Sequence, residues 1–556
     1  MKTLKEINVK KIRIIGFHSG HDSSYGILEN GVPLIHNELE RFNRRKNSVG
    51  DSLNLFLKDK HSKEVKNMAT HRTCGVVNNR YMDSFNKCEE LINKNKGKLY
   101  ITGHHQAHAA NAFFTSDFKE SLIITIDGGG IDNENGGLHS KSTIDKGGSG
   151  GIITCTTFWY GKDNKIEPIK MIDKGKINLG LDWAQCTSKI FGLGTQKDPQ
   201  GDQAGTVMGM AALGDPNKYL PHFKGKLTAN LLENDNKGAI DFNYLNKEAN
   251  KLEQNKFDIA AALQQETEIV IKNLLSPLIE KYQPKNLCLS GGVSLNCVAV
   301  GKMLDWFPGI NIFCDPIPYD AGLSLGSARY LWHHILNNPR IYNNPKNRSP
   351  YLGCSYDKST ISQTLDKFNS KIEIQKDIDD NYVINELINK KIIAVFGGGS
   401  ESGRRALGNR SILADPRHKE TKDIVNKKVK HRQWFRPFAP SILREDVKDW
   451  FIYDVDSPYM SFALPFKGQK SKQVPAVTHF NNTARLQTVK EEDNKWYYNF
   501  IKKFKNKTGV PILLNTSFND REPIVETPEH AIKCFLKTDL DYLYFRDYNI
   551  LINKIK

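Results

Sequence analysis

Residues 11–28 read KIRIIGFHSGHDSSYGIL, which is an apolar run, a turn of glycine and polar residues, and a second apolar run. The pattern predicts two strands joined by a tight turn, and residues 32–38 (VPLIHNE) predict a third strand. A second unit of this kind lies at residues 121–130 (SLIITIDGGG), where a strand runs into Asp127 and three glycines. Two such units indicate that this part of the chain consists of two similar α/β halves.

The two strand–turn units are typical of a duplicated actin-like domain, which holds a nucleotide between its halves. Farther along, apolar residues at helical spacing predict a long helix over residues 255–281, which Pro284 ends. A short strand at 286–290 and a helix over 294–304 follow, separated by two glycines. This order continues the α/β alternation.

Residues 337–350 (NNPRIYNNPKNRSP) are rich in Pro and Asn and poor in apolar side chains, which is typical of a linker. A strand is predicted beyond it at residues 392–396, again followed by three glycines. We therefore divide the chain into a larger α/β domain, residues 1–345, and a smaller α/β domain, residues 346–556. Residues 132–151 are polar and Gly-rich, and we expect a surface loop or hairpin there.

The composition is that of an ordinary globular protein: 39% of the 556 residues are hydrophobic and 25% are charged. No apolar run approaches the roughly 20 residues that span a bilayer, and residues 1–11 lack the apolar region of a secretory signal. The nine cysteines form no CxxC pair, which argues against a disulfide scaffold or a zinc ribbon. We therefore expect reduced thiols, a cytoplasmic location and no membrane partner.

Lysine and arginine total 79 and aspartate and glutamate 62, so the formal net charge is +17. A basic protein attracts phosphate-bearing partners, including nucleic acids. The alternative is that the charge reflects composition alone, because surface segments such as residues 92–96 (INKNK) are crowded with Lys, Asn and Ile. Both explanations remain open at this stage, and the sequence predicts no oligomeric state.

The stretch 103–108 (GHHQAH) carries the first candidate site. On a helix, His104 and His108 are one turn apart and project from one face, so the two imidazoles can bind one metal ion. Asp127, where a predicted strand ends, and Asp320, in a Gly-containing turn, can add carboxylates; Asp320 can equally bind a ribose. Imidazole ligands favour iron, zinc or nickel over magnesium. The alternative is that both histidines cap or pack a helix without metal.

Glycine turns and arginines indicate a second candidate site, for anions. Gly291 and Gly292 join a predicted strand to a helix, whose N-terminus favours negative charge. In the second half of the chain, basic residues lie in apolar or Gly-rich surroundings, where an unpaired charge is costly. Either carboxylates or a phosphate-rich ligand must pair with them, and the group as a whole favours a phosphate site. The group comprises Arg405, Lys430, Arg436 and Arg485, followed by the hydroxyl of Ser517.

Taken in order along the chain, these motifs resemble the O-carbamoyltransferase family, which includes tobramycin, cephalosporin and nodulation-factor carbamoyltransferases. The similarity covers nearly the whole chain. Beyond the two histidines and the two aspartates, its motifs are HDS (21–23), ERFNRRK (40–46), GGVSLN (291–296), RALGNRSILADPR (405–417), RPFAP (436–440), ARLQTV (484–489) and NTSFN (515–519).

The resemblance implies an actin-like first domain, similar to the subunit that makes threonylcarbamoyl-adenosine in tRNA, and a YrdC-like second domain. It also implies a reaction in two steps. Carbamoyl phosphate and ATP, with Mg²⁺, form carbamoyl-adenylate in the second domain. The adenylate then reaches the first domain, where an acceptor hydroxyl attacks its carbonyl carbon.

By the same resemblance, each candidate residue receives a role. Carbamoyl phosphate or the phosphates of ATP are held by Arg405, Lys430, Arg436, Arg485 and Ser517. The adenylate phosphate is held by Fe²⁺ or another divalent transition metal, whose ligands are His104, His108, Asp127 and Asp320. The same phosphate and the nucleoside are also held by Gly128, Gly129, Gly291, Gly292 and Asn296.

His21 and Lys46 lie by the acceptor hydroxyl in this resemblance. Of the two, His21 is the better general base, because imidazole titrates nearest neutral pH. The alternative for His21 is a turn histidine that bonds to the backbone.

Three positions depart from the family pattern. Thr206 replaces the usual Lys of Gly-Lys-Val-Met-Gly, and Arg404 replaces the Pro of Gly-Pro-Arg-Ala-Leu-Gly. Asp520-Arg521 leads directly to Glu522, where a Gly is usual before Glu-Pro. These differences bear on local nucleotide contacts and on the class of acceptor.

The acceptor hydroxyl belongs either to a small natural product, such as a sugar or an aminoglycoside, or to a hydroxymethyl pyrimidine in a nucleotide or in DNA. Two other functions are a tRNA threonylcarbamoyl-transfer enzyme and a nucleotide-binding regulatory module. The fused second domain, with its RALGNRS and NTSFN motifs, argues against the first. The complete set of metal ligands argues against the second.

Overall fold

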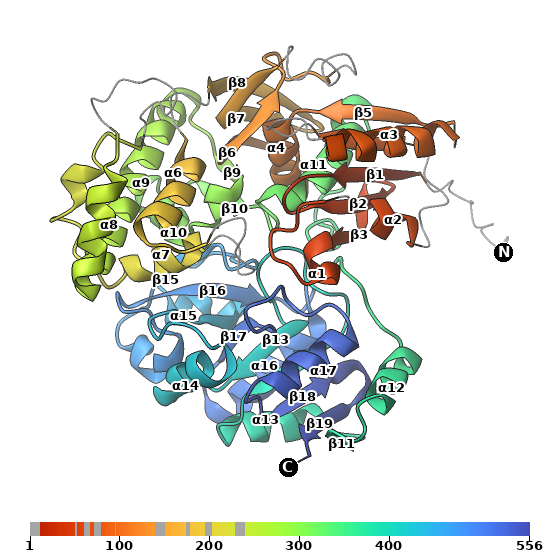
Figure 1. The fold of residues 1–556 in the computed structure, drawn as a ribbon, viewed down its shortest axis with the longest axis vertical. Coiled ribbons are helices and arrows are strands. Elements are labelled where there is room, and N and C mark those ends of the chain that lie inside the picture. Colours follow the sequence, from red (N-terminus) through yellow and green to blue (C-terminus); the bar gives the residue numbers. More distant parts are fainter. Residues whose placement is uncertain are drawn as a thin grey trace, which may run out of the picture.

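The computed structural model describes residues 12–50, 53–59, 67–71, 79–94, 96–139, 151–173, 178–194, 203–227 and 239–555. Three sheets organise this part of the chain. Figure 1 shows two sheets in the N-terminal part, drawn from red to green, and the third in the C-terminal part, drawn from green-blue to blue.

The first sheet is built around the stretch that opens the described chain. Its order is β3-β2-β1-β4-β5, in which β1, β2 and β3 are antiparallel neighbours while β1, β4 and β5 run parallel. All six residues of the central strand β1 are buried, as a strand covered on both faces requires. The strands are β1 (Arg13–His18), β2 (Ser24–Glu29), β3 (Val32–Glu38), β4 (Asn67–His71) and β5 (Lys98–Thr102).

The second sheet repeats this plan. Its order is β10-β9-β6-β7-β8, with antiparallel β6, β7 and β8 and parallel β6, β9 and β10. Both sheets thus place their first strand in the centre, two antiparallel strands on one side and two parallel strands on the other, so the prediction of a duplicated actin-like domain is confirmed. The strands are β6 (Glu120–Asp132), β7 (Ile152–Lys162), β8 (Lys165–Asp173), β9 (Asn286–Ser290) and β10 (Asn311–Cys314).

Strand β6 differs from the prediction in its length. It was expected to end at Asp127, yet it continues to Asp132, with an irregularity in its pairing with β7 between Ile126 and Gly130. Glycines tolerate the backbone conformations of such a bulge. The bulge carries Asp127 out of the regular ladder. The loop predicted over residues 132–151 lies mostly outside the described residues.

Two helices fill the space between the sheets. Helix α11 (Leu323–Arg329) packs on the first sheet, α4 (His104–Thr115) packs on the second, and the two helices contact each other. The approach is close, because a Cβ at Gly16 would lie 1.5 Å from the Ser324 carbonyl oxygen and one at Gly326 would lie 2.0 Å from that of Ala107. This packing brings the last residues of β1 and the first turn of α4 beside α11.

The other helices of the N-terminal part follow the predicted order. The long helix expected over residues 255–281 is α9 (Glu253–Tyr282). The helix expected from Ser294 begins instead at Cys297, because residues 292–295 form a 3-10 turn and Asn296 caps the helix through Ala299 N. The remaining helices are α1 (Leu39–Asn43), α2 (Leu53–Leu57), α3 (Asn79–Lys94), α6 (Leu179–Gln185), α7 (Ala204–Ala211), α8 (Phe242–Lys251) and α10 (Cys297–Trp306).

The third sheet has nine strands in the order β11-β19-β18-β12-β13-β17-β14-β16-β15, and it mixes parallel with antiparallel pairs. The expected second α/β domain is confirmed, while a specifically YrdC-like character stays an implication of the resemblance. Its strands are β11 (Ile372–Gln375), β12 (Ile393–Phe396), β13 (Arg410–Ala414), β14 (Ala439–Leu443), β15 (Phe462–Pro465), β16 (Thr483–Val489), β17 (Ile512–Ser517), β18 (Tyr542–Phe545) and β19 (Ile550–Lys554). Its helices are α12 (Lys358–Asp366), α13 (Asp380–Ile388), α14 (Glu420–Ile424), α15 (Val447–Trp450), α16 (Lys495–Thr508) and α17 (Pro528–Lys537).

The segment 337–350 connects the two parts without helix or strand. It is fastened to the first part, since Arg340 donates a 2.8 Å hydrogen bond to Phe113 O and Arg348 pairs with Asp117 at 2.9 Å. In the described chain, no strand before residue 345 pairs with a strand after it. The two parts pack directly, because α10 lies on β15 and a Cβ at Gly301 would come within 2.3 Å of the Ala463 carbonyl oxygen.

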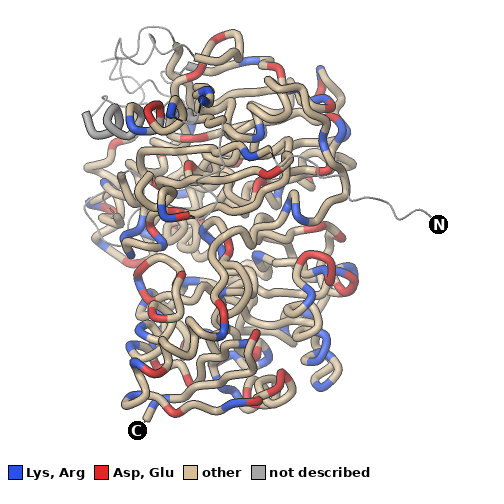
Figure 2. Tube along the Cα trace, turned by 90° about the vertical axis from the view of Figure 1, so that its right-hand side faces the viewer, with Lys and Arg blue, Asp and Glu red and all other residues tan. Residues whose placement is uncertain are grey.

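Charge is distributed without a single basic face in the view of Figure 2, where Lys and Arg alternate with Asp and Glu along the chain. Within the described residues, no helix has the length and apolar character needed to cross a membrane. The cysteines there that can be assessed are free, as expected for reduced thiols; they are Cys155, Cys186, Cys288, Cys297, Cys314, Cys354 and Cys534.

Candidate functional site

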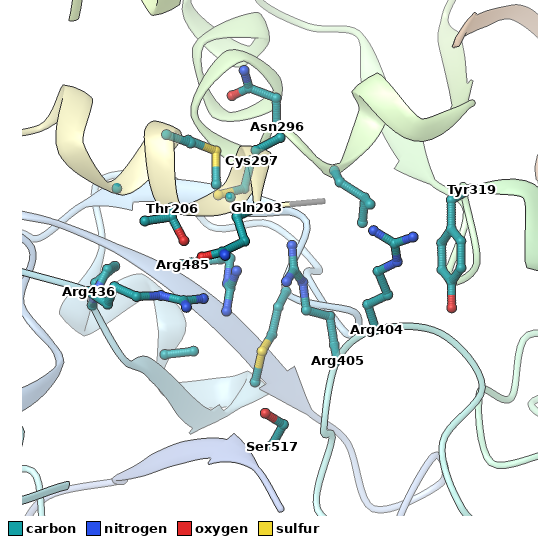
Figure 3. A pocket seen from close by; sticks show the side chains of 18 of the residues that line it. Gln203, Thr206, Asn296, Cys297, Tyr319, Arg404, Arg405, Arg436, Arg485 and Ser517 are labelled. Carbon is teal, nitrogen blue, oxygen red and sulfur yellow. The ribbon is translucent and has the colours of Figure 1, made fainter. Parts of the chain in front are cut away.

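A cavity of about 1020 Å³ lies between the two parts of the chain, and Figure 3 shows some of its lining. Its walls come from turns, helices and strands of both domains. The predicted binding and catalytic residues in its lining are His21, Lys46, Gly128, Gly292, Asn296, Arg405, Lys430, Arg436, Arg485 and Ser517, together with the metal-ligand candidates Asp127 and Asp320.

Two predicted glycines lie outside this lining. Gly291 has a φ of +86°, and a Cβ there would approach the Ile126 carbonyl oxygen to 2.3 Å, so glycine lets the turn after β9 pack against β6. Gly129 lies in the irregular part of β6. Both shape the backbone behind the cavity.

The metal-ligand candidates form one cluster, although they come from three separate elements. Helix α4 carries His104 and His108, β6 carries Asp127, and the turn before α11 carries Asp320. One ligand atom from each of these four residues lies within 4.8 Å of the others. His108 Nε2 is 3.2 Å from Asp127 Oδ2 and 3.6 Å from Asp320 Oδ1, while His104 Nε2 is 3.8 Å from Asp320 Oδ1.

The protonation of this cluster suits a divalent cation. Burial lowers the pKa of His104 to about 3, so its imidazole is neutral and has a lone pair to offer. Burial would also lower the pKa of His108, but its hydrogen bonds with Asp127 and Asp320 outweigh burial and raise the pKa to about 9. Metal binding would replace that proton. Two imidazoles and two carboxylates at these separations therefore fit a transition metal.

The carboxylate of Asp127 is oriented by the backbone. Its Oδ1 accepts a hydrogen bond from Gly128 N at 2.6 Å and its Oδ2 accepts one from Gly292 N at 3.0 Å. The two predicted glycine turns thus meet at this residue. His105, on the same helix turn, is not one of the four ligand candidates, and its Nδ1 lies 2.5 Å from Thr125 Oγ1.

A buried polar chain lies behind His108. Its Nδ1 is 3.4 Å from Ser290 Oγ, which in turn donates to Asp315 Oδ2 at 3.2 Å, and Asn111 donates to the same oxygen at 2.8 Å. When Ser290 donates to Asp315, its oxygen is left to accept from His108 Nδ1. That arrangement keeps the Nε2 lone pair directed at the metal-ligand cluster.

We expect Asp315→Asn to weaken transition-metal affinity about 10- to 100-fold, which is the usual effect of losing such an outer partner. The measurement is a competitive metal titration against a chromogenic chelator. Asp258→Asn is the matched control, because Asp258 is also buried but accepts from Asp215 N at 2.9 Å, away from the cluster. Equal affinities for the two variants would contradict the orienting role.

His21 lies at the edge of the metal-ligand cluster. Its Nδ1 is 3.1 Å from Asp22 Oδ2 and its Nε2 is 3.2 Å from Asp320 Oδ2. The charge on Asp320 is the main reason that the pKa of His21 is raised to about 10, so this imidazole does not titrate near neutral pH as its type alone suggested. A cation bound by Asp320 would offset that charge and favour the neutral imidazole that a base needs.

The second domain supplies a cluster of cations, which we call the arginine cluster: Arg405, Arg432, Arg436 and Arg485. Figure 3 shows Arg405, Arg436 and Arg485 directed into the same space. No hydrogen bond or ion pair joins the side chains of these three to any described residue, and Arg485 Nε is buried without a partner. Burial and neighbouring arginines lower the pKa of Arg405 to about 9 and that of Arg436 to about 10.

The surroundings of these guanidiniums disfavour their positive charge. A guanidinium stays charged at neutral pH, so a lowered pKa marks an environment that disfavours its charge. The groups acting on Arg432, Arg436 and Arg485 are other arginines and Cys297, with no described carboxylate among them. The arginine cluster therefore lacks counter-charge within the described protein, and a polyanion such as a triphosphate would supply it.

Lys430 and Ser517 border the arginine cluster but are bonded to each other. Lys430 Nζ donates to Ser517 O at 2.8 Å, to Ser517 Oγ at 3.3 Å and to Asn519 O at 2.8 Å. The lysine thereby fixes the end of β17, while its charge adds to that of Arg432. Their direct contact with carbamoyl phosphate stays a prediction.

Lys46 comes from the first domain but faces the arginine cluster. Burial and the charge of Arg436 lower its pKa to about 8, and Arg404 and Arg432 add to the effect. The resemblance places Lys46 beside the acceptor hydroxyl with His21, whereas the charged group that acts most strongly on it, Arg436, belongs to the second domain. A lysine among arginines at the domain boundary is suited to a phosphate shared by both sides.

Several lining residues were not in the predicted set. Arg404 was noted only as a departure from the family pattern, although it precedes Arg405. Arg432 received no role, although it lies two residues after Lys430. The others had no assigned role, although Glu40 and Arg41 begin the ERFNRRK motif and Arg521 lies at a departure from the family pattern. No sequence signal marks Gln203, Tyr319 and His479. Conversely, Arg410 in the same motif is fully buried and bonds to Gly397 O and Cys354 O, so it supports the backbone and not a ligand.

Comparison with known proteins gives matches over most of the chain. It matches the family description "Carbamoyltransferase N-terminus" over residues 37–329 and "Carbamoyltransferase C-terminus" over residues 384–552. It is 34% identical over 503 residues to the uncharacterized protein sll1178 of Synechocystis, covering 81% of this chain and 76% of that protein. Nodulation protein NolO of Bradyrhizobium diazoefficiens is 34% identical over 462 residues, which are 79% of this chain and 77% of NolO.

Among solved structures, HypF of T. kodakarensis overlaps 61% of this chain and 49% of its own, with a TM-score of 0.35 and 12% sequence identity. The sequence matches are the stronger finding, because they run through both domains in the same order. The chain therefore belongs to the carbamoyltransferase family and is a carbamoyltransferase.

Proposed function

We propose that this carbamoyltransferase makes carbamoyl-adenylate from carbamoyl phosphate and Mg²⁺-ATP at the arginine cluster, and then transfers the carbamoyl group to an acceptor hydroxyl beside the metal-ligand cluster. The observation that carries the proposal is that one cavity contacts both clusters. A reactive adenylate can thus pass from one to the other without entering bulk water.

In the first step, water releases inorganic phosphate from carbamoyl phosphate and leaves carbamate. A carbamate oxygen then forms a bond to the α-phosphorus of ATP, and pyrophosphate leaves. Negative charge is concentrated on the phosphates throughout, so the four guanidiniums of the arginine cluster bind and orient them. Lys46 adds a fifth cation from the first domain, which draws the two sides of the cavity together around the ligand.

In the second step, the acceptor hydroxyl oxygen attacks the carbonyl carbon of carbamoyl-adenylate. The bond from that carbon to the phosphate oxygen breaks and AMP leaves. His21 takes the hydroxyl proton once its imidazole is neutral. A divalent metal at His104, His108, Asp127 and Asp320 supplies neutralisation of the charge that develops on the AMP phosphate.

The acceptor is a small hydroxyl compound in the version we favour. Basic and acidic residues alternate in Figure 2, so the +17 charge marks no extended surface for DNA in that view. The unpaired cations lie inside the cavity, where they face the phosphates of the donor. A hydroxymethyl pyrimidine nucleotide remains the second candidate, because Arg404 and Arg521 also line the cavity.

The test is incubation of the protein with ATP, Mg²⁺, carbamoyl phosphate and a panel of hydroxyl compounds. The panel contains sugars, aminoglycosides, hydroxymethyl pyrimidine nucleotides and DNA with that base. We expect pyrophosphate release that depends on carbamoyl phosphate, and a mass gain of one carbamoyl group on one acceptor class. Absence of carbamoyl-phosphate-dependent pyrophosphate release would refute the adenylate step.

A further inference from the structure

A short segment of the second domain, residues 401–404, is docked on the first domain beside His21. Glu38 Oε1 accepts a 2.6 Å hydrogen bond from Gly403 N, and Arg41 Nη2 donates to Glu401 O at 3.2 Å and also to Gly403 O. Both first-domain residues are buried. We call residues 401–404 the docking segment.

Arg404 ends the docking segment and contacts first-domain side chains. Its Nη2 donates to Asp22 Oδ1 at 3.1 Å and Oδ2 at 3.2 Å, and to Asn47 Oδ1 at 3.3 Å. Its guanidinium lies over the Tyr319 ring, 4.4 Å from the centroid, as Figure 3 shows. Tyr319 is itself fixed by a 2.6 Å hydrogen bond to Glu38. The guanidinium is therefore held on more than one side.

Asp22 connects Arg404 to His21. It is 4% exposed, and its φ of +59° is uncommon for a residue other than glycine, so its conformation depends on its surroundings. Its Oδ2 is 3.1 Å from His21 Nδ1, and His21 Nε2 is 3.2 Å from Asp320 Oδ2. A continuous polar chain thus runs from Arg404, across the domain boundary, to the edge of the metal-ligand cluster.

The residue after Arg404 belongs to the arginine cluster. Burial and the charge of Arg485 lower the pKa of Arg405, whereas Arg404 forms an ion pair with Asp22. Two consecutive side chains of one backbone segment therefore line the cavity with different neighbours, Asp22 of the first domain for Arg404 and the arginine cluster for Arg405.

We propose that Arg404 is a positioning residue for carbamoyl transfer: from the second domain it holds Asp22, and through Asp22 it sets the orientation of the His21 imidazole. The inference rests on the proposed function of His21 as the proton acceptor. Without Arg404, the buried Asp22 carboxylate loses its charged partner, and the imidazole loses the fixed acceptor at its Nδ1. An imidazole that is free to turn presents its basic nitrogen to the acceptor hydroxyl for a smaller fraction of the time.

The test is a double-mutant cycle of Arg404→Ala and Asp22→Asn, measured on the rate of transfer from supplied carbamoyl-adenylate. Pyrophosphate release from ATP and carbamoyl phosphate is followed in parallel. We expect Arg404→Ala to slow transfer at least tenfold more than it slows pyrophosphate release. In the Asp22→Asn background, Arg404→Ala should add less than a twofold effect, because the residue acts through Asp22. Arg404→Lys should recover part of the rate, since it keeps one charged bond.

Arg44→Ala is the matched control for a general weakening of the contact between the two domains. Arg44 also crosses the boundary, donating to Ile524 O at 2.8 Å and pairing with Glu522 at 3.3 Å, but it contacts neither Asp22 nor His21 in the described structure. Equal slowing by Arg44→Ala, or independent effects of Arg404→Ala and Asp22→Asn, would overturn the positioning role. His21→Ala distinguishes the proposed function from this inference. Full transfer activity in His21→Ala would refute His21 as the proton acceptor. Slow transfer in His21→Ala together with normal transfer in Arg404→Ala would refute only the positioning role of Arg404.

Discussion

Replacing both His104 and His108 by alanine is expected to remove a bound transition metal and to abolish carbamoyl transfer. These imidazoles are the two nitrogen ligands of the cluster, and the carboxylates of Asp127 and Asp320 remain as a set that prefers harder ions. The loss of transfer should exceed the roughly 10- to 100-fold effect of removing an outer partner of a metal ligand. Elemental analysis gives the metal per chain, and supplied carbamoyl-adenylate isolates the transfer step.

His333→Ala is the control for loss of a buried histidine. His333 is 3% exposed and bonds to Asn338 O at 3.1 Å, and it is not one of the four residues of the metal-ligand cluster. The control should keep its metal and its transfer activity. If the double variant keeps the same metal stoichiometry as the wild-type protein, the four-residue assignment is wrong.

Arg436→Ala is expected to slow carbamoyl-adenylate formation strongly while the variant still uses supplied carbamoyl-adenylate. Arg436 has no partner in the described protein, so its charge is available for a phosphate. A charge-assisted hydrogen bond of this kind contributes about 1.5–3 kcal/mol, and the rate of pyrophosphate release should fall by at least about tenfold. Equal loss with both donors would show that the two steps do not separate by domain.

The same substitution should leave the ligand-free protein as stable as the wild type or more stable. Arg436→Ala removes a half-buried cation that lies among other cations, so repulsion is relieved. Arg410→Ala is the matched contrast, because Arg410 is fully buried and bonds to Gly397 O and Cys354 O. That variant should unfold at a lower temperature, since its carbonyl partners would be left unpaired. Thermal unfolding without nucleotide measures the change in unfolding temperature of each variant. A lower unfolding temperature for Arg436→Ala would mean that Arg436 supports the fold.

Features that depend on neighbouring residues could be predicted well from the sequence. The strands of the two strand–turn units, the long helix α9 and the HxxxH pair all follow from periodicity over a few residues. The bulge in β6 was missed, because a run of glycines is compatible with both the end of a strand and an interruption inside one. The start of α10 was missed by three residues, because residues 292–295 form a separate 3-10 turn and Asn296 caps the helix only after it.

The sequence by itself determined the α/β class, the duplication, the family and the residue types of both clusters. Only the tertiary structure decided which distant residues meet. Asp320 reaches His104 and His21 because glycines let α11 pack closely on β1 and α4. Arg404 pairs with Asp22 because the docking segment lies across the domain boundary, and the packing of the two domains places Lys46 near Arg436. Pairing and pKa depend on distances through space, and packing sets those distances between residues that the sequence keeps far apart.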